Sequence, residues 1–255
     1  MRALLLAAGI GSRLRPLTDT IPKCLVPIHG RPLLAYWLDL LFLGGIDRAL
    51  INTHHLADKV RSFVMSSPWR ERIDLVKEDI LLGTGGTIVA NRSYFGRGSL
   101  LVAHADNLTN LDLRSFVAAH ATRPDGCVLT MLAFRTDDPK SCGILELNQA
   151  GTVCAFHEKV EAPPGNLANA AVYILEPEII DYALALNKPI VDFQTEIIPA
   201  FLDRIYAVEH RGYHRDIGNL ESLRRAQIEF PKPAPYVYNR QPKTHARALY
   251  APEAG

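Results

Sequence analysis

The stretch that decides the fold is ALLLAAGIGSRLRPL, residues 3–17. Its continuous apolar run predicts a central strand that is buried on both faces and ends at a glycine-rich turn. Gly9 and Gly11 allow the backbone of that turn to approach a ligand closely. Arg13 and Lys23 add positive charge nearby. Because open α/β sheets bind ligands beyond the carboxyl ends of their strands, we interpret this loop as a cradle for a polyphosphate.

Strand and helix patterns alternate through the first half of the chain. Short apolar runs indicate strands, and apolar residues at helical spacing indicate helices. Such alternation predicts a mostly parallel sheet with helices on both faces. The expected strands are 3–8, 48–53, 73–78, 99–106 and 127–134, and the expected helices are 31–45, 55–67, 85–95 and 112–121.

The pattern changes from about residue 136. Residues 142–159 predict two strands joined by a turn, and 168–175 another strand. Residues 205–218 are typical of a hairpin. Helices are expected over 177–186, 193–204 and 219–230, the last capped by Asn219. From residue 231 the chain is rich in Pro and Ala without an apolar period, which predicts a surface-clinging or disordered end.

Composition excludes several classes of protein. A formal net charge of +1 over 255 residues argues against a nucleic-acid or membrane-surface partner. We see neither a signal peptide nor an apolar run long enough to cross a bilayer. The four cysteines form no C-x-x-C pair and no zinc-ligand spacing with histidine, so we expect reduced, mostly buried thiols in the cytoplasm.

Two familiar phosphate-binding motifs do not fit the opening loop. The dinucleotide fingerprint needs a third glycine where Leu14 stands, and no acid follows about 20 residues later. The Walker lysine motif is also absent. On the residues alone, a glycine-rich turn with incidental surface arginines remains an equal alternative to a phosphate cradle.

The longer string LLLAAGIGSRLRPLTDTIPKCLVPIHGRPLL, residues 4–34, resembles the signature of the sugar-1-phosphate nucleotidylyltransferases. Later segments follow that family's order: LLGTGGTI, LLVAHADN, GILELNQAGTVCAFHEK, NLANAAVYIL and GYHRDIGNLESLRRAQ. The resemblance covers about residues 1–228. It implies a Rossmann-like, mixed and mostly parallel sheet with a β-rich sugar-binding subregion. Residues 1–230 would form the nucleotidyltransferase domain, with a nucleotide half at 1–135, a sugar half at 136–230 and a tail at 231–255.

The resemblance also implies a reaction in which a sugar 1-phosphate attacks a nucleoside triphosphate and pyrophosphate leaves. The attacking phosphate oxygen is already ionised at neutral pH, so no general base is required. Arg13 would support the departing pyrophosphate and Lys23 would reach the α-phosphate. Asp106 and Asp216 would hold Mg²⁺, a hard ion that takes one or two carboxylates together with phosphate oxygens.

The remaining implied contacts divide between the two substrates. The nucleotide would contact Leu6, Ala8, Gly9, Gly11, Arg13, Lys23, Glu78, Gly83 and Thr84. On the sugar side, Lys159 would bind the phosphate and Glu158 the sugar hydroxyls, while Gly143 and Asn169 would line the pocket. In isolation, Glu158 and Lys159 are more typical of a solvated ion pair on a strand edge.

The nucleobase prediction depends on Glu78. A carboxylate can accept both adjacent N–H groups of guanine, whereas thymidylyl and uridylyl relatives often carry glutamine at the resembling position. The resemblance therefore favours GTP with a manno-configured substrate, heptose 1-phosphate or mannose 1-phosphate. Alternatives are a uridylyl- or thymidylyltransferase acting on glucose 1-phosphate or N-acetylmuramate 1-phosphate, and a non-catalytic nucleotide-sugar-binding regulator. The sequence leaves open whether the chain forms a homo-oligomer.

Overall fold

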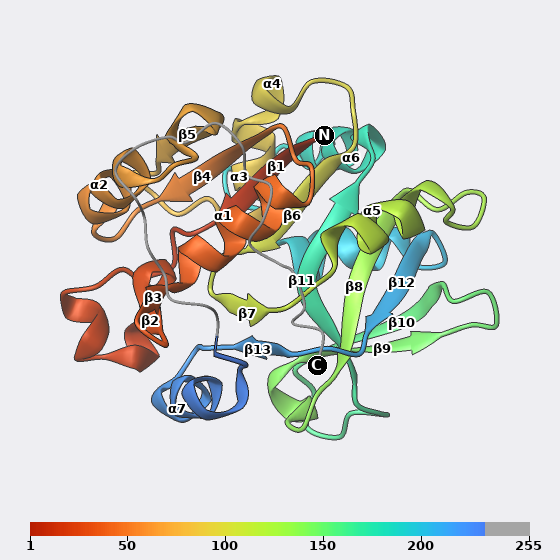
Figure 1. Cartoon of the computed structure of the whole chain (residues 1–255). Helices are drawn as coiled ribbons and strands as arrows, with labels where there is room; N and C mark the ends of the chain where they lie inside the picture. Colours follow the sequence, from red (N-terminus) through yellow and green to blue (C-terminus); the bar gives the residue numbers. More distant parts are fainter. Residues whose placement is uncertain (233–255) are drawn as a thin grey trace, which may run out of the picture.

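The computed structural model describes residues 1–232, through which a mixed nine-stranded sheet runs (Figure 1). Its strands are β1 (Arg2–Leu6), β4 (Arg48–Thr53), β5 (Ile73–Lys77), β6 (Leu100–His104), β8 (Leu129–Arg135), β9 (Gly143–Leu147), β10 (Val153–Glu158), β11 (Leu167–Leu175) and β12 (Ile205–His210). The first half is parallel in the order β5-β4-β1-β6. Antiparallel β11 joins it to β8 and β12 on one side and to β9 and β10 on the other.

Helices cover both faces of this sheet. They are α1 (Leu33–Leu43), α2 (Ala57–Ser66), α3 (Gly83–Ala90), α4 (Arg92–Phe95), α5 (Leu113–Ala121), α6 (Pro177–Ala185) and α7 (Leu220–Glu229). Ala3 and Leu5 of β1 face a cluster that includes α1, α2, α5 and α7, while Leu4 faces α3, α4 and α6. Since successive strand residues point to opposite faces, one apolar strand supplies both cores. The predicted α/β class, with its central first strand, is confirmed.

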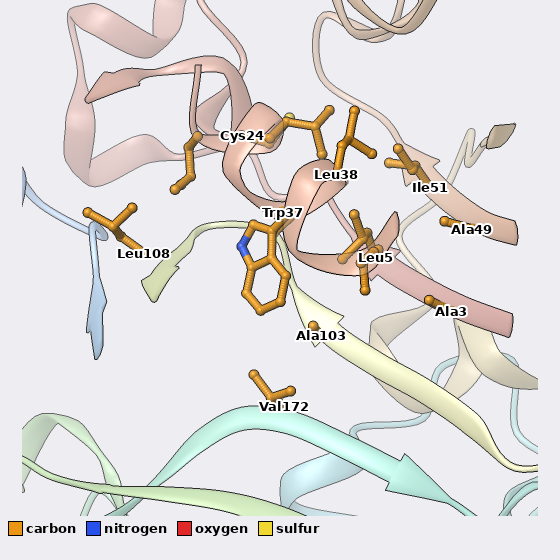
Figure 2. Packing of buried hydrophobic residues seen from close by; sticks show 14 of the residues in the cluster. Ala3, Leu5, Cys24, Trp37, Leu38, Ala49, Ile51, Ala103, Leu108 and Val172 are labelled. Atoms are coloured by element: carbon orange, nitrogen blue, oxygen red, sulfur yellow. The ribbon is translucent and has the colours of Figure 1, made fainter. Parts of the chain in front are cut away.

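Trp37 of α1 connects the larger core to the carboxyl end of the sheet. Its side chain is 2% exposed, and its indole N–H donates to the carbonyl of Asn107 at 2.7 Å. Figure 2 shows the indole pointing from α1 toward Ala103 and Val172, on β6 and β11. Asn107 begins the short strand β7 (Asn107–Thr109), so this packing fixes the turn that leaves β6.

The hairpin predicted for residues 205–218 is wrong. Strand β12 pairs in parallel with β8 at the edge of the main sheet, whereas β13 (His214–Asp216) pairs antiparallel with β7. Asn110, which follows β7, holds the segment before β13 next to β7, because its Oδ1 accepts the Tyr213 amide at 2.7 Å. This long-range side-chain contact leaves no trace in the local pattern.

The helix predicted over 193–204 is also irregular. Residues Phe193–Ile197 form a π-type turn and Ile198–Phe201 a 3₁₀ turn. Pro199 cannot donate the hydrogen bond that an α-helix would need at that position. Asp192 begins the segment, and its side chain accepts the amides of Gln194 and Thr195.

Several smaller expectations can be compared with residues 1–232. Asn219 caps α7 as predicted, since its Oδ1 accepts the Ser222 amide at 2.8 Å. All four thiols are free, but only Cys24 and Cys127 are buried, so the thiols are less buried than expected. Within this range no helix combines the length and apolar character that a bilayer crossing needs. The predicted tail, apart from its first two residues, lies outside the described range. A further short pair, β2 (Pro27–Ile28) and β3 (Arg31–Pro32), precedes α1.

Candidate active site

The loop after β1 exposes backbone at the carboxyl end of the parallel strands. Gly11 has a φ of +70°, and its carbonyl accepts the Thr18 hydroxyl at 2.8 Å. A side chain at Gly11 would also come within 2.9 Å of Thr18, so glycine fits this turn for two reasons. Around Gly9, by contrast, a Cβ would meet nothing within 4 Å. The fully buried Leu14 anchors the loop to the core, whereas Gly9 and Ile10 are exposed to solvent.

Three charged side chains meet beside this loop. The ammonium of Lys23 lies 2.5 Å from Asp106 Oδ2 and 3.1 Å from Asp216 Oδ1. Lys23 is 8% exposed, and its position is set by a one-turn 3₁₀ helix, Lys23–Leu25. Asp106 and Asp216 lie 83 and 193 positions after Lys23 in the sequence, yet all three side chains meet at one centre.

Two strands bring the carboxylates together. Asp106 lies in the turn between β6 and β7, and Asp216 ends β13, where it pairs with Asn107. The amide of Ile217 donates to the carbonyl of Asp106 at 3.3 Å. The small β7–β13 sheet is thus what places both acids at the end of β6.

The charges of this centre stabilise one another. Burial alone would lower the pKa of Lys23, but the two carboxylates outweigh it and raise that pKa above its usual value. Burial would likewise raise the pKa of Asp106, yet Lys23 keeps it below its ordinary range. At neutral pH the Lys23 ammonium therefore faces an ionised Asp106.

Arg13 lies at the edge of the same centre. A Cβ placed on Gly218 would come within 3.0 Å of Arg13 Nη2 and 2.7 Å of Asp216 Oδ2. The guanidinium is exposed at the open side of the loop. Arg13, Lys23, Asp106 and Asp216, predicted from separate motifs, are therefore brought together.

The donor set suits a hard divalent cation. Asp106 and Asp216 both reach the position that the Lys23 ammonium occupies, and carboxylate oxygens are the ligands that Mg²⁺ prefers. Within residues 1–232 no group of three or more His, Cys, Asp or Glu side chains forms a ready-made cage. An ion here would complete its shell with phosphate oxygens and water, which is the usual Mg²⁺ pattern.

The segment predicted to contact the base has a different geometry from the expected one. Glu78 is 6% exposed, and its Oε1 already accepts hydrogen bonds from Asn52 at 2.9 Å and Thr87 at 2.6 Å. Gly83, with a φ of +72°, opens α3; a Cβ there would lie 2.6 Å from the Val191 carbonyl. Thr84, which follows, is half-buried. Direct base contact by Glu78 stays a prediction.

The predicted sugar residues gather on β9, β10 and β11. Gly143 pairs with Glu158 across β9 and β10, and Lys159 lies 3.0 Å from the Glu158 carboxylate. Asn169 is 9% exposed; its amide donates to the Tyr173 hydroxyl at 2.7 Å, and its oxygen accepts the Ala171 amide at 2.9 Å. Lys159 is mostly exposed, so an approaching anion can reach its ammonium and would share it with Glu158.

Glycine at position 143 is explained by packing. A Cβ there would lie 2.5 Å from the Phe156 ring and 2.6 Å from Glu158 Oε2. We expect Gly143→Ala to lower the free energy of unfolding by about 1–3 kcal/mol, as overpacking typically does. Urea unfolding measures this, with Gly165→Ala as the control because a Cβ there meets nothing within 4 Å. Equal stability of the two variants would contradict the packing explanation.

Sequence reasoning missed two groups close to the candidate site residues. The Gln194 side-chain amide, oriented to donate, lies 3.0 Å from Glu158 Oε1 and ties the irregular 193–201 segment to the sugar residues. The second group is His104, which ends β6; burial lowers its pKa, although the negative charges of Asp106, Asp216 and Asp192 oppose that shift. Gln194 could have been found from sequence through Asp192, because an aspartate that caps a turn places Gln194 at the start of that turn.

Fold and site together are those of α/β proteins that bind nucleotides at the carboxyl end of a parallel sheet. Comparison with known proteins defines the group further. The nucleotidyl transferase family model matches residues 2–232, so the chain belongs to that family.

Curated relatives differ in the nucleotide that their names give. The mannose-1-phosphate guanylyltransferase of Mycobacterium tuberculosis is 29% identical over 99% of this chain and 72% of its own length. The UTP--glucose-1-phosphate uridylyltransferase of Synechocystis is 30% identical over 86% of this chain and 61% of its own. The chain thus spans between three fifths and three quarters of these two relatives.

A solved structure of similar length also matches. HddC from Yersinia pseudotuberculosis, complexed with GMP-PN, has a TM-score of 0.75 and 26% identity, covering 90% of this chain and 99% of that one. The structural similarity therefore covers nine tenths of this chain and almost the whole of HddC.

Proposed function

We propose that this protein transfers a nucleoside monophosphate, GMP in preference, from its triphosphate to a sugar 1-phosphate. The manno-configured substrates, mannose 1-phosphate and heptose 1-phosphate, are the favoured acceptors. The observation that carries the proposal is the meeting of Lys23, Asp106 and Asp216 beside an open glycine loop. The guanylyltransferase relative and the GMP-PN complex of HddC are consistent with guanine as the base.

The residues divide the work by charge. A phosphate oxygen of the sugar 1-phosphate forms a bond to the α-phosphorus, the bond between that phosphorus and the bridging oxygen breaks, and pyrophosphate leaves. Exposed amides of the loop and Arg13 would bind the β- and γ-phosphates, and Lys159 would hold the sugar phosphate. Positioning and charge stabilisation are the main tasks in such a transfer.

Lys23 has to exchange partners for this role. Its ammonium lies between two carboxylates, and to reach an α-phosphate it would leave at least one of them. Asp106 and Asp216 would then hold Mg²⁺, which supplies positive charge to the phosphate oxygens when bound. Each carboxylate thus has a cationic partner with and without substrate.

The second candidate is a uridylyl- or thymidylyltransferase acting on glucose 1-phosphate or N-acetylmuramate 1-phosphate. The 30% identity to the Synechocystis uridylyltransferase favours it to nearly the same degree. Glu158 and Asn169 can bind hydroxyls of either sugar configuration.

A pyrophosphate-release assay separates the two candidates. GTP, UTP, dTTP and ATP are each combined with mannose, heptose, glucose and N-acetylmuramate 1-phosphates in the presence of Mg²⁺. We expect the largest kcat/KM with GTP and a manno-configured acceptor. A clear preference for UTP or dTTP would support the second candidate, and no release in any combination would refute the transfer itself.

A further inference from the structure

The peptide between Leu6 and Ala7 is held on both sides just before the glycine loop begins. Its carbonyl accepts the amide of Ala105, the neighbour of Asp106, at 3.0 Å. Its N–H donates to the side chain of Asn52 at 2.7 Å. One side of this peptide is therefore fixed by the carboxylate turn and the other by a buried amide.

Asn52 passes this contact on to the segment around Glu78. Asn52 lies on β4, is 3% exposed, and donates through Nδ2 to Glu78 Oε1 at 2.9 Å. The same carboxylate oxygen accepts the Thr87 hydroxyl of α3 at 2.6 Å. The end of β1, β4, the end of β5 and α3 are thereby joined by one chain of hydrogen bonds.

The directions of the two Asn52 bonds in this chain are fixed. The backbone N–H of Ala7 can only donate, so it must meet the oxygen of the Asn52 amide, while the nitrogen of that amide faces the Glu78 carboxylate. Truncating Asn52 would leave the Ala7 N–H and one carboxylate contact unsatisfied inside the protein. Such buried losses are costly because neither group regains water.

We propose that Asn52 is a positioning residue, which acts through Glu78 and Thr87 to hold the phosphate loop in register with α3. Glu78 on this view anchors the network and does not select the base. Its Oε1 already has two donors, and the residue is 94% shielded from solvent. In kinetic terms the inference rests on the proposed function, since it assigns these residues to the placement of the triphosphate.

Amide hydrogen exchange tests the network without any substrate. In Asn52→Ala we expect the Ala7 amide to exchange at least about tenfold faster than in the native protein, because its acceptor is gone. Thr130→Val is the control: Thr130 is fully buried and bonded to His120 Nδ1 at 2.7 Å, on β8 outside the network. Unchanged protection of Ala7 in Asn52→Ala would overturn the proposal.

Kinetics test what the network does. Thr87→Val removes the hydroxyl at nearly constant shape, and Thr87→Ser restores it. We expect Thr87→Val to lower kcat/KM for the triphosphate by about tenfold to a hundredfold through loop displacement, and Thr87→Ser to recover most of it. If Thr87→Val loses no more activity than Thr130→Val, the loss is one of general stability and the proposal fails.

Glu78→Gln separates anchoring from base selection. Glutamine can still accept from Asn52 and Thr87, but it cannot accept two N–H groups of guanine at one edge as a carboxylate does. We expect the ratio of kcat/KM for GTP to that for UTP to change less than about threefold. A tenfold shift toward UTP would make Glu78 the base-selecting residue and overturn this assignment. Absence of turnover in the native protein would refute the proposed function, while the exchange experiment would still decide the network.

Discussion

Asp106→Asn and Asp216→Asn are each expected to reduce turnover by about a thousandfold, which corresponds to about 4 kcal/mol of transition-state stabilisation. Asparagine keeps the shape of each side chain but removes the charge that would hold Mg²⁺. Both acids contact the Lys23 ammonium, so each substitution also leaves that cation with one charged partner. The effect should appear in kcat, measured by pyrophosphate release at saturating substrates over a range of Mg²⁺ concentrations.

Asp112→Asn is the matched control for these two variants. Asp112 caps α5 by accepting the amides of Arg114 and Ser115, and it lies outside the candidate site. We expect it to lower stability by less than about 1 kcal/mol, because asparagine also caps well, and to leave turnover unchanged. Circular dichroism of the three variants tests whether each is folded. Near-normal rates in either Asp106→Asn or Asp216→Asn would remove that carboxylate from the metal site.

The residues that could be found from sequence are those whose signal is local. The apolar run before Gly9 identifies a buried strand, and a ligand loop follows from the geometry of open sheets. Asp106 follows another buried strand, but a lone aspartate there is more typical of a turn or a helix cap, so its assignment to the site depended on the family resemblance. Asp216 needed the family resemblance, since its neighbours suggested a hairpin and its true partner, β7, is remote in sequence.

The parts that could not be predicted depend on buried polar contacts across long sequence distances. Asn52 and Thr87 lie in ordinary strand and helix patterns, and nothing nearby shows that both donate to Glu78. The family resemblance therefore implied a ligand contact for Glu78. Burial, which sequence gives only as an average tendency, is what favours the anchoring role.

Lys23→Met is expected to affect both stability and turnover. Methionine fills a similar volume, but without the ammonium Asp106 and Asp216 repel each other. Breaking a buried ion pair typically costs about 3–5 kcal/mol; we expect about 2–3 kcal/mol here because the Asp216 side chain is 54% exposed. Turnover should fall by about a hundredfold or more, since one positive group on the reacting phosphates is lost.

Magnesium distinguishes this explanation from a simple packing defect. In Lys23→Met the two carboxylates no longer have an ammonium between them, so the added ion takes its place as their counter-charge. We therefore expect Mg²⁺ to raise the Tm of Lys23→Met more than that of the native protein, because a ligand stabilises the state that binds it more tightly. Lys23→Arg, which keeps the charge, should show the native response. If Mg²⁺ shifts the Tm of Lys23→Met no more than it shifts that of Asp106→Asn, the ammonium and the ion do not share a site, and Lys23 acts on the phosphates alone.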